Sequence, residues 1–436
     1  MKKEVAVFWF RRDLRLDDNT AFYKALTSGV PVLPIFIFDP EILKELPRND
    51  ARVSFIHRQL RQMRKILQDQ QEASLALFHG NPVEVFRDLL DQWQIKAVYT
   101  NRDYEPYARK RDKEIGALLE KADIPLHTFK DQVIFEKSEV VKGDGDPYVV
   151  YTPYMKKWKE VLGEVGEPEL VPSESKLEHL IPIKALPYLS LEDIGFEQSS
   201  ISVPDYSLEE SLISRYEQTR NIPSKEGTSH LGPHLRFGTV SIRKVLERAR
   251  KSENETFWNE LIWREFFMQI LWHFPHTVEE AFKKKYDRIR WRNREGEFER
   301  WKQGKTGYAL VDAGMRELNQ TGYMHNRVRM LVASFLCKHL LIDWRWGEAY
   351  FAEKLLDYEL SSNVGNWQWA AGSGVDAAPY FRIFNPITQV DKFDKARTYI
   401  RKWIPEYGTD AYPEKMVDHK KARERCLEVY KEALNG

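Results

Sequence analysis

The sequence has little cysteine, no long hydrophobic run and almost no net charge. Cys337 and Cys426 are the only cysteines in 436 residues, too few and too far apart for a disulfide framework or a zinc site. We therefore expect a reducing compartment, by default the cytoplasm, and no bound metal. No run approaches the length of a membrane span, so no membrane association is expected. The net charge of +1 does not by itself indicate nucleic-acid binding.

The first third of the chain alternates short apolar runs with amphipathic stretches, as in residues 51–68. This alternation predicts an α/β domain with a doubly wound parallel sheet. No G-x-G-x-x-G or Walker loop follows an expected strand, so a dinucleotide is not predicted at this sheet. The charged and apolar start of the chain is interrupted by Arg11, Arg12 and Asp13, which indicates a first strand and not a signal peptide. The expected strands are residues 5–10, 32–38, 75–78, 97–100 and 126–129.

The remainder of the chain has a different pattern. Residues 163–204 carry repeated Pro, Ser, Glu and Leu without clear periodicity, which is typical of a connector lying over the surface. The 3.6-residue period then dominates and predicts an all-helical second domain, ending in a charged, solvated helix over residues 419–434. The predicted divisions are an α/β domain (1–130), a connector (131–204) and a helical domain (205–436).

A basic run lies between residues 283 and 294, with Tyr286 and Trp291 among its lysines and arginines. Basic and aromatic residues together are typical of nucleic-acid surfaces. A solvated helical face is the commoner explanation for a charge run considered alone.

Helical spacing places Glu260, Trp263, Arg264 and Phe267 along one face of a helix. An unpartnered buried charge costs several kcal/mol, so a carboxylate and a guanidinium on such a stripe indicate a ligand site. The simpler alternative is a half-exposed helix on which Glu260 and Arg264 pair at i,i+4 beside a core tryptophan.

A second helix, expected over residues 324–335, repeats this design. Asn326, Arg329 and Met330 fall at i, i+3 and i+4. Two polar and aromatic stripes imply one shared cavity, which favours the ligand site over the simpler alternative.

Further blocks accompany the two stripes, and together they resemble the DNA photolyase and cryptochrome family. The resemblance is closest to the class I cyclobutane pyrimidine dimer photolyases of bacteria, and it extends from Phe10-Arg11-Arg12-Asp13-Leu14-Arg15 to Thr388-Gln389. It implies an α/β antenna domain followed by an all-α domain that binds FAD and DNA. The other blocks are residues 228–238, 357–363 and 367–371.

By this resemblance FAD is held in a helical pocket, where Arg329 pairs with Asp357 and Asn363 faces the reactive ring nitrogen. Hydroxyls, amides and helix N-termini must hold the diphosphate, because no glycine loop is available. Thr228 and Ser229 fit that task, although both are also good N-cap residues for the following helix. The cofactor-binding residues implied are Tyr216, Thr228, Ser229, His230, Leu231, Gly232, Phe257, Arg264, Asn326, Arg329, Asp357, Tyr358, Glu359 and Asn363.

The activity implied is that of a deoxyribodipyrimidine photo-lyase, in which photoexcited reduced FAD passes an electron to a cyclobutane dimer flipped out of UV-damaged DNA. Glu260 would hydrogen-bond a thymine edge, and Trp367, Trp344 and Trp291 would relay electrons that reduce the flavin. Bulky aromatics in a helical domain are otherwise usually core residues. A monomer is the default expectation. The substrate-binding residues implied are Arg220, Glu260, Trp263, Asn326, Arg327, Met330, Trp369 and Gln389.

Several positions depart from the family pattern. Glu359 stands where a second Asp is usual, and Gly365-Asn366 where two glycines are usual. Photolyases for the (6-4) product typically carry a second histidine close to the one at His325, whereas this chain has Asn326 next and Met330 one turn on, which favours the cyclobutane dimer.

The antenna site also departs from the pattern. Pro106, Tyr107 and Ala108 follow the antenna-side loop 101–105 in place of residues that grip a folate, so methenyltetrahydrofolate is not expected. A deazaflavin, a second flavin and an empty cleft stay open.

Two other functions compete with DNA repair. A cryptochrome would sense blue light through its flavin without repairing DNA; signalling members commonly append a long C-terminal extension, whereas this chain ends soon after the helical domain. A structural nucleic-acid-binding protein would explain the basic run but not the blocks between residues 357 and 369.

Overall fold

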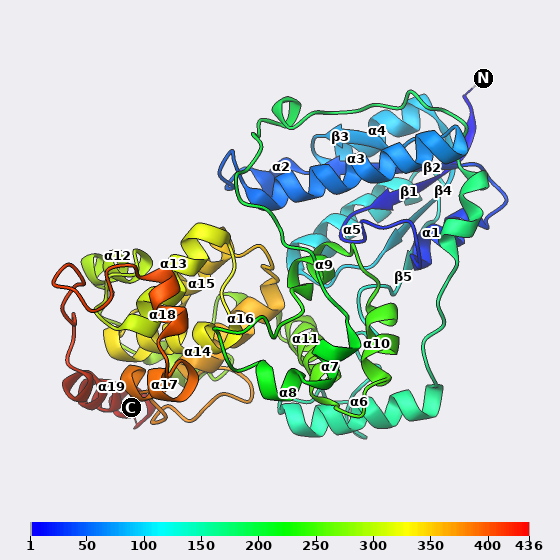
Figure 1. Ribbon diagram of the computed structural model, residues 1–436. Helices are drawn as coiled ribbons and strands as arrows, with labels where there is room; N and C mark the ends of the chain where they lie inside the picture. Colours follow the sequence, from blue (N-terminus) through cyan, green and yellow to red (C-terminus); the bar gives the residue numbers. More distant parts are fainter. Residues whose placement is uncertain (1, 436) are drawn as a thin grey trace. The chain divides into compact units, whose positions relative to one another are not determined.

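The computed structural model describes residues 2–435 as two compact units, each assembled from three segments of the chain (Figure 1). The first unit takes residues 2–136, 161–206 and 230–251, and the second takes 137–160, 207–229 and 252–435. Among the residues described, no helix is both long and apolar enough to cross a membrane.

A five-stranded parallel sheet forms the centre of the first unit, in the order β3-β2-β1-β4-β5. Val7 in the middle of β1 lies beside Leu33 of β2 and Val98 of β4. The prediction of an α/β unit with a parallel sheet is confirmed. The strands are β1 (Glu4–Phe10), β2 (Val32–Phe38), β3 (Ala76–His79), β4 (Gln94–Asn101) and β5 (Leu126–Phe129).

Alternate side chains of β1 point to opposite faces of the sheet, as successive residues of a strand do. Val7 and Trp9 belong to a core with residues of α4 (Pro82–Gln92) and α5 (Pro106–Glu120). Phe8 and Phe10 instead contact Phe22 of α1 (Thr20–Leu26), at ring-centroid distances of 4.8 and 5.3 Å. Both faces of β1 are buried, which explains its continuous apolar run.

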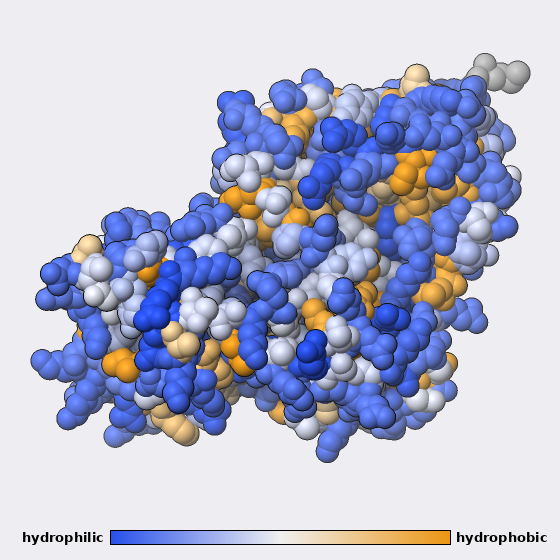
Figure 2. Space-filling model, viewed as in Figure 1, coloured by the Kyte–Doolittle hydropathy of each residue, from blue (hydrophilic) through white to orange (hydrophobic). Residues whose placement is uncertain are grey.

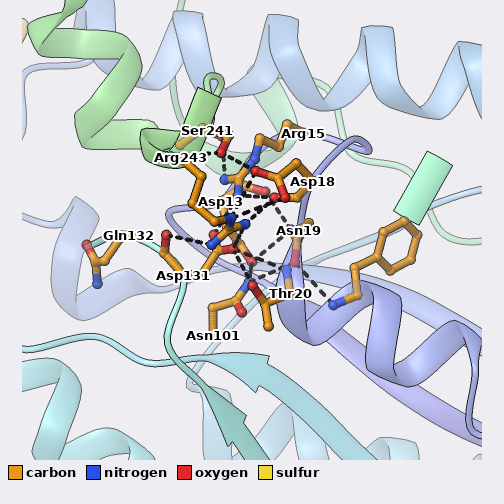
Figure 3. Close-up of polar contacts among 12 residues, drawn as sticks. Asp13, Arg15, Asp18, Asn19, Thr20, Asn101, Asp131, Gln132, Ser241 and Arg243 are labelled. Carbon is orange, nitrogen blue, oxygen red and sulfur yellow. Dashed lines mark hydrogen bonds and ion pairs between the residues drawn. The ribbon is translucent and has the colours of Figure 1, made fainter. Parts of the chain in front are cut away.

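The first unit also contains a buried network of charged side chains beyond the carboxyl end of β1 (Figure 3). Asp131 accepts hydrogen bonds from Arg15 at 2.8 Å and from Arg243 at 2.9 Å, and Arg243 also contacts Asp18 at 3.0 Å. Burial tends to raise the pKa of Asp131, but the two guanidinium groups outweigh it and lower the pKa. Burial raises the pKa of neighbouring Asp13. Asp18 and Asp131 are thus paired with arginines, as the desolvation of a buried charge requires, whereas Asp13 accepts hydrogen bonds from the Asn19 and Asn101 side chains.

The remaining helices of the first unit come from separate parts of the chain. Residues 163–204 were expected as an irregular connector; residues 163–165 end helix α6, and the rest carry only two short 3-10 helices among their described elements. The helices of the first unit not yet named are α2 (Pro40–Leu43), α3 (Ala51–Gln71), η1 (Ser173–His179), η2 (Glu192–Ile194), α9 (Leu231–Phe237) and α10 (Ile242–Arg250). Helix α6 (Tyr151–Val165) is shared: residues 151–160 belong to the second unit and residues 161–165 to the first.

The second unit is helical, as predicted, and its core is rich in aromatic rings such as Trp301, Phe335, Phe351 and Trp367. A six-residue π-helix, η5 (Phe335–Leu340), continues directly from α14. The helices are α7 (Glu210–Ser214), α8 (Tyr216–Thr219), α11 (Thr256–His273), η3 (Pro275–Val278), η4 (Lys284–Arg288), α12 (Glu295–Lys302), α13 (Ala309–Thr321), α14 (Asn326–Ser334), α15 (Trp344–Lys354), α16 (Leu360–Ala371), α17 (Pro386–Phe393), α18 (Thr398–Trp403) and α19 (His419–Asn435).

Hydrophilic residues cover most of the face seen in Figure 2, and hydrophobic residues appear there only in small, separate groups. This distribution agrees with a sequence in which charged residues make up 31% of the chain.

Candidate functional site

A cavity that is partly open to solvent lies in the second unit among α14, α15 and α16, with about 590 Å³ of empty space including its open mouth. Its lining mixes charged, amide and aromatic side chains, as a ligand that is partly polar and partly aromatic requires. Nine predicted site residues line it: Asn326, Arg329, Met330, Asp357, Tyr358, Glu359, Asn363, Trp367 and Trp369.

Arg329 and Asp357 form the strongest polar contact in this lining. The two guanidinium nitrogens of Arg329 donate to the two carboxylate oxygens of Asp357 at 3.0 and 2.9 Å, and its Nε donates to the Met324 carbonyl at 2.6 Å. Burial tends to lower the pKa of Arg329, but Asp357 outweighs it and raises the pKa. The pairing implied by the family resemblance is therefore present, with both side chains fixed in a planar, bidentate geometry.

The start of α14 sets the position of this arginine. The His325 ring accepts a hydrogen bond from the Arg327 backbone N–H at 3.2 Å and so caps the helix. Burial lowers the pKa of His325 to about 4, so the ring is neutral near pH 7 and keeps a lone pair for the cap. One turn of helix then carries Asn326, Arg329 and Met330 to the cavity.

Asn363 is held by a residue that sequence reasoning missed. Its amide nitrogen donates to the Glu348 carboxylate at 2.8 Å and to the Glu348 carbonyl at 3.1 Å. Burial raises the pKa of Glu348, and the bond from Asn363 lowers it in part. Because the amide nitrogen is engaged, the carbonyl oxygen of Asn363 is left to accept a hydrogen bond from a ligand N–H.

Glu359, the departure from the family pattern, is buried and lines the cavity. Its carboxylate lies 3.7 Å from the guanidinium of Arg264 on α11. Glu359, at the start of α16, thus links the cavity lining to Arg264 of the α11 stripe, although no residue of that stripe lines the cavity itself.

Glu260 forms an ion pair with Arg220, which lies 40 residues away in sequence. Burial raises the pKa of Glu260, and Arg220 opposes the shift without cancelling it. The local alternative, in which Glu260 and Arg264 are a surface pair, is wrong: Glu260 pairs with Arg220, Arg264 reaches Glu359, and both are only partly exposed.

The predicted lesion-contacting side chains gather in the second unit. Met330 and Trp369 line the cavity itself. Arg327 donates to the Asn221 side chain at 2.6 Å and lies over the Phe393 ring at 4.6 Å, which ties it to α17, the helix that carries Gln389. The structure does not place Gln389 in the cavity lining.

The three predicted relay indoles differ in their surroundings. Trp367 lines the cavity and is buried, Trp344 is buried at the start of α15, and Trp291 is partly buried with Tyr430 at 6.1 Å. Gly347 allows α15 to lie directly on Trp367, since a Cβ there would come within 2.1 Å of the indole.

Several predicted cofactor residues lie outside this cavity. Tyr216, Thr228, Ser229 and Phe257 lie elsewhere in the second unit. Helix capping, the simpler explanation for Thr228 and Ser229, is wrong, because the N-cap of α9 is His230 with φ 54°; Thr228 instead contacts the Tyr323 hydroxyl at 3.2 Å. The first unit holds His230, Leu231 and Gly232.

Other lining residues were not predicted, although helical spacing could have found some of them. Ser362, Asn366 and Ala370 share one face of α16 with Asn363 and Trp367. Phe351 and Leu355, which also line the cavity, and Glu348, which holds Asn363, carry no such signal, because no polar stripe was predicted on α15.

The first unit has a smaller hollow, of about 230 Å³, beyond the carboxyl ends of β1 and β4. Open parallel sheets bind ligands in this position. It is lined by Arg11, Arg12, Asp13, Asn101, Arg102, Asp103, Asp131 and Gln132. Within residues 2–435, no group of three or more His, Cys, Asp or Glu side chains is arranged to hold a metal ion.

Two protein-family models match the chain. One, described as DNA photolyase, covers residues 6–173, and the other, described as the FAD binding domain of DNA photolyase, covers residues 257–410. The deoxyribodipyrimidine photo-lyase of Synechococcus sp. is 36% identical over 466 aligned positions, which cover 97% of this chain and 96% of that protein.

Solved structures give the same result. A class III photolyase from Agrobacterium tumefaciens matches with a TM-score of 0.89 and 35% identity, over 100% of this chain and 99% of that one. An archaeal photolyase from Sulfolobus tokodaii, described as containing two FAD molecules, matches with a TM-score of 0.84 and 32% identity, over 98% and 100% of the two chains.

An α/β unit combined with a helical unit that carries a flavin cavity defines a class of two-unit flavoproteins. Within that class, this chain belongs to the DNA photolyase family. The predictions of the family, of FAD as cofactor and of a photo-lyase enzyme are confirmed. The similarity to a class III enzyme means that class I is not favoured over class III.

Proposed function

We propose that this protein repairs cyclobutane pyrimidine dimers in UV-damaged DNA under blue light, using FAD held in the cavity of the second unit. The observation that carries the proposal is the composition of that cavity. The Arg329–Asp357 pair and Asn363 share one lining with Trp369 and Met330. A polar set suited to a flavin and an apolar set suited to pyrimidine rings thus lie within one site.

The residues present fit a flavin. Arg329 and Asp357 offer fixed donors and acceptors for the polar edge of the ring, and Glu359 adds a second carboxylate to the lining. The free acceptor on Asn363 suits a ring nitrogen that carries a proton. When bound, FAD supplies the light-driven electron that splits the dimer; the protein supplies position and electrostatics.

The apolar part of the lining supports a cyclobutane dimer as substrate. Trp369 offers an indole surface for a pyrimidine extruded from the helix, and base–aromatic stacking contributes about 1 to 3 kcal/mol per base. The Met330 thioether has no proton to donate, and the Asn326 amide neither gains nor loses a proton near neutral pH. Repair of a (6-4) product would need an acid that these two positions do not provide.

Glu260 supports the same proposal from α11. Because burial raises its pKa, the carboxyl group retains its proton to a higher pH than an exposed glutamate. In that form it can donate a hydrogen bond to a carbonyl of a pyrimidine edge. Arg220, its ion-pair partner, would then be released to contact a phosphate of the damaged strand.

The experiment combines two measurements on the purified protein reconstituted with FAD. A thymine-dimer oligonucleotide is illuminated with blue light under reducing conditions, and restored thymine is followed at 260 nm. We expect repair that needs both light and FAD. Flavin photoreduction without dimer loss would overturn the proposal in favour of a cryptochrome; a protein that binds no flavin would overturn both.

A further inference from the structure

Tyr151 lies face to face on Trp263. The ring centroids are 3.5 Å apart and the ring planes differ by 6°. Tyr151 begins α6, more than 100 residues before Trp263 on α11. Sequence spacing gave no indication of this contact.

Two further contacts fix Tyr151 against this indole. Its hydroxyl donates to the Asn259 carbonyl at 2.8 Å, one turn before Trp263 on the same helix. The edge of Phe266 approaches the ring at 5.9 Å and 79°. Tyr151 is thus held both by its hydroxyl and by its ring.

Trp263 needs such a support because its side chain is only partly buried. A partly exposed indole can turn about its side-chain torsions, and fixing it when a ligand binds costs free energy. A parallel aromatic partner that is already fixed restricts this rotation in advance.

We propose that Tyr151 is a positioning residue that holds the plane of Trp263 for stacking of the extruded pyrimidine dimer. The inference rests on the proposed function, because it assigns Trp263 to that substrate. Tyr151 itself needs no contact with the dimer.

The test replaces Tyr151 with Leu, which removes the aromatic face, and with Phe, which keeps the face and loses only the hydroxyl bond to Asn259. Tyr148→Leu is the matched control, because Tyr148 belongs to the same segment but its ring contacts Tyr154 at 6.4 Å. Each variant is measured for bound FAD, for Kd with a dimer-containing and an undamaged oligonucleotide, and for repair yield at saturating DNA.

We expect Tyr151→Leu to bind dimer-containing DNA about tenfold more weakly, with unchanged FAD content and unchanged affinity for undamaged DNA. Tyr151→Phe should restore most of the affinity, and Tyr148→Leu should match wild type. Should Tyr151→Leu lose flavin or fold poorly, Tyr151→Met is measured in the same way.

Different results would overturn the proposed function and the positioning role of Tyr151. A wild-type protein that does not distinguish dimer-containing from undamaged DNA would overturn the proposed function and this inference with it. A wild-type preference that Tyr151→Leu keeps in full, or an equal loss for both oligonucleotides, would overturn the positioning role alone.

Discussion

Arg329 holds Asp357 through two parallel hydrogen bonds at the edge of the flavin cavity. Replacing Arg329 with Lys keeps the charge but not the planar double contact. Loss of a charge-assisted pair of this kind costs about 2 to 3 kcal/mol, so we expect FAD affinity to fall at least tenfold. The ratio of flavin to protein absorbance after dialysis measures the loss.

Arg345→Lys is the control for that prediction, because Arg345 also forms an ion pair, with Asp287 at 2.8 Å, but does not line the cavity. It should retain flavin as wild type does. Equal retention by Arg329→Lys would contradict a role for the Arg329–Asp357 pair in binding FAD.

The second prediction concerns pH. The proton on Glu260 is needed for its proposed hydrogen bond, and its pKa is raised above the ordinary value of 4.5. Repair should therefore be highest at low pH and fall as pH rises through this raised pKa, where Glu260 ionises and pairs with Arg220. Arg220→Met removes the charge that opposes the shift, so the fall should move to higher pH.

Glu260→Gln should flatten the profile, since an amide does not titrate. The exposed Glu255, paired with Lys159, provides Glu255→Gln as a control that should keep the wild-type profile. A profile that keeps its fall in Glu260→Gln would show that another group is responsible.

The third prediction distinguishes Trp291, a member of the predicted electron relay, from Trp301, a core tryptophan close to Trp367. Trp291→Phe should slow light-driven flavin reduction if Trp291 ends the proposed relay. Trp301→Phe is the informative comparison, because the Trp301 indole lies 6.2 Å from Trp367 yet is fully buried in the core. Absorbance of the flavin during illumination gives both rates. Normal photoreduction in Trp291→Phe would remove it from the relay.

Structural features that depend on local periodicity, such as the strands and the helical stripes, were predicted well from the sequence. Each expected strand matches an observed one to within about three residues at either end. The signal is clearest in β1 and β2, which are buried on both faces and therefore apolar almost throughout. The two stripes on α11 and α14 were recognised from helical spacing alone, and Arg264 of the first reaches Glu359 at the start of α16.

Contacts between distant segments could not be predicted in the same way. Nothing in the sequence near Glu260 indicates Arg220 as its partner, and the i,i+4 rule favoured the wrong one. Asp13 and Arg15 were noted as a motif, but their buried partners are distant: Asp13 accepts a hydrogen bond from Asn101, 88 residues away, and Arg15 pairs with Asp131, 116 residues away. Such pairings are set by tertiary packing, which periodicity does not encode.

The fourth prediction concerns acid stability. His339 is buried in η5, shares a 2.9 Å hydrogen bond with His419 of α19, and burial lowers its pKa to about 3. The unfolded ring takes up a proton near pH 6.5, whereas the folded ring does not. Stability is therefore fully present above pH 6.5 and is lost as pH falls from there toward 3.

His339→Phe should make the free energy of unfolding less dependent on pH in this window, measured by urea denaturation at pH 7, 5.5 and 4. The ring of His339 already stacks on Phe335, at 4.8 Å and 18°, so a phenyl ring fits the site. His179→Gln, at an exposed histidine, should leave the slope unchanged. An unchanged slope in His339→Phe would assign the acid sensitivity elsewhere.

The fifth prediction concerns the buried network of the first unit. Arg243→Met leaves Asp18 and Asp131 without their shared guanidinium, and breaking a buried pair in this way costs about 3 to 5 kcal/mol. The next residue gives the control: Lys244 pairs with Asp17 at the surface, so Lys244→Met should cost less than about 1 kcal/mol. Urea denaturation followed by circular dichroism measures both.

Because Asp131 is also held by Arg15, the double variant Arg243→Met with Asp18→Asn should recover part of the loss by removing the second uncompensated charge. Equal costs for Arg243→Met and Lys244→Met would mean that water reaches the network and screens its charges.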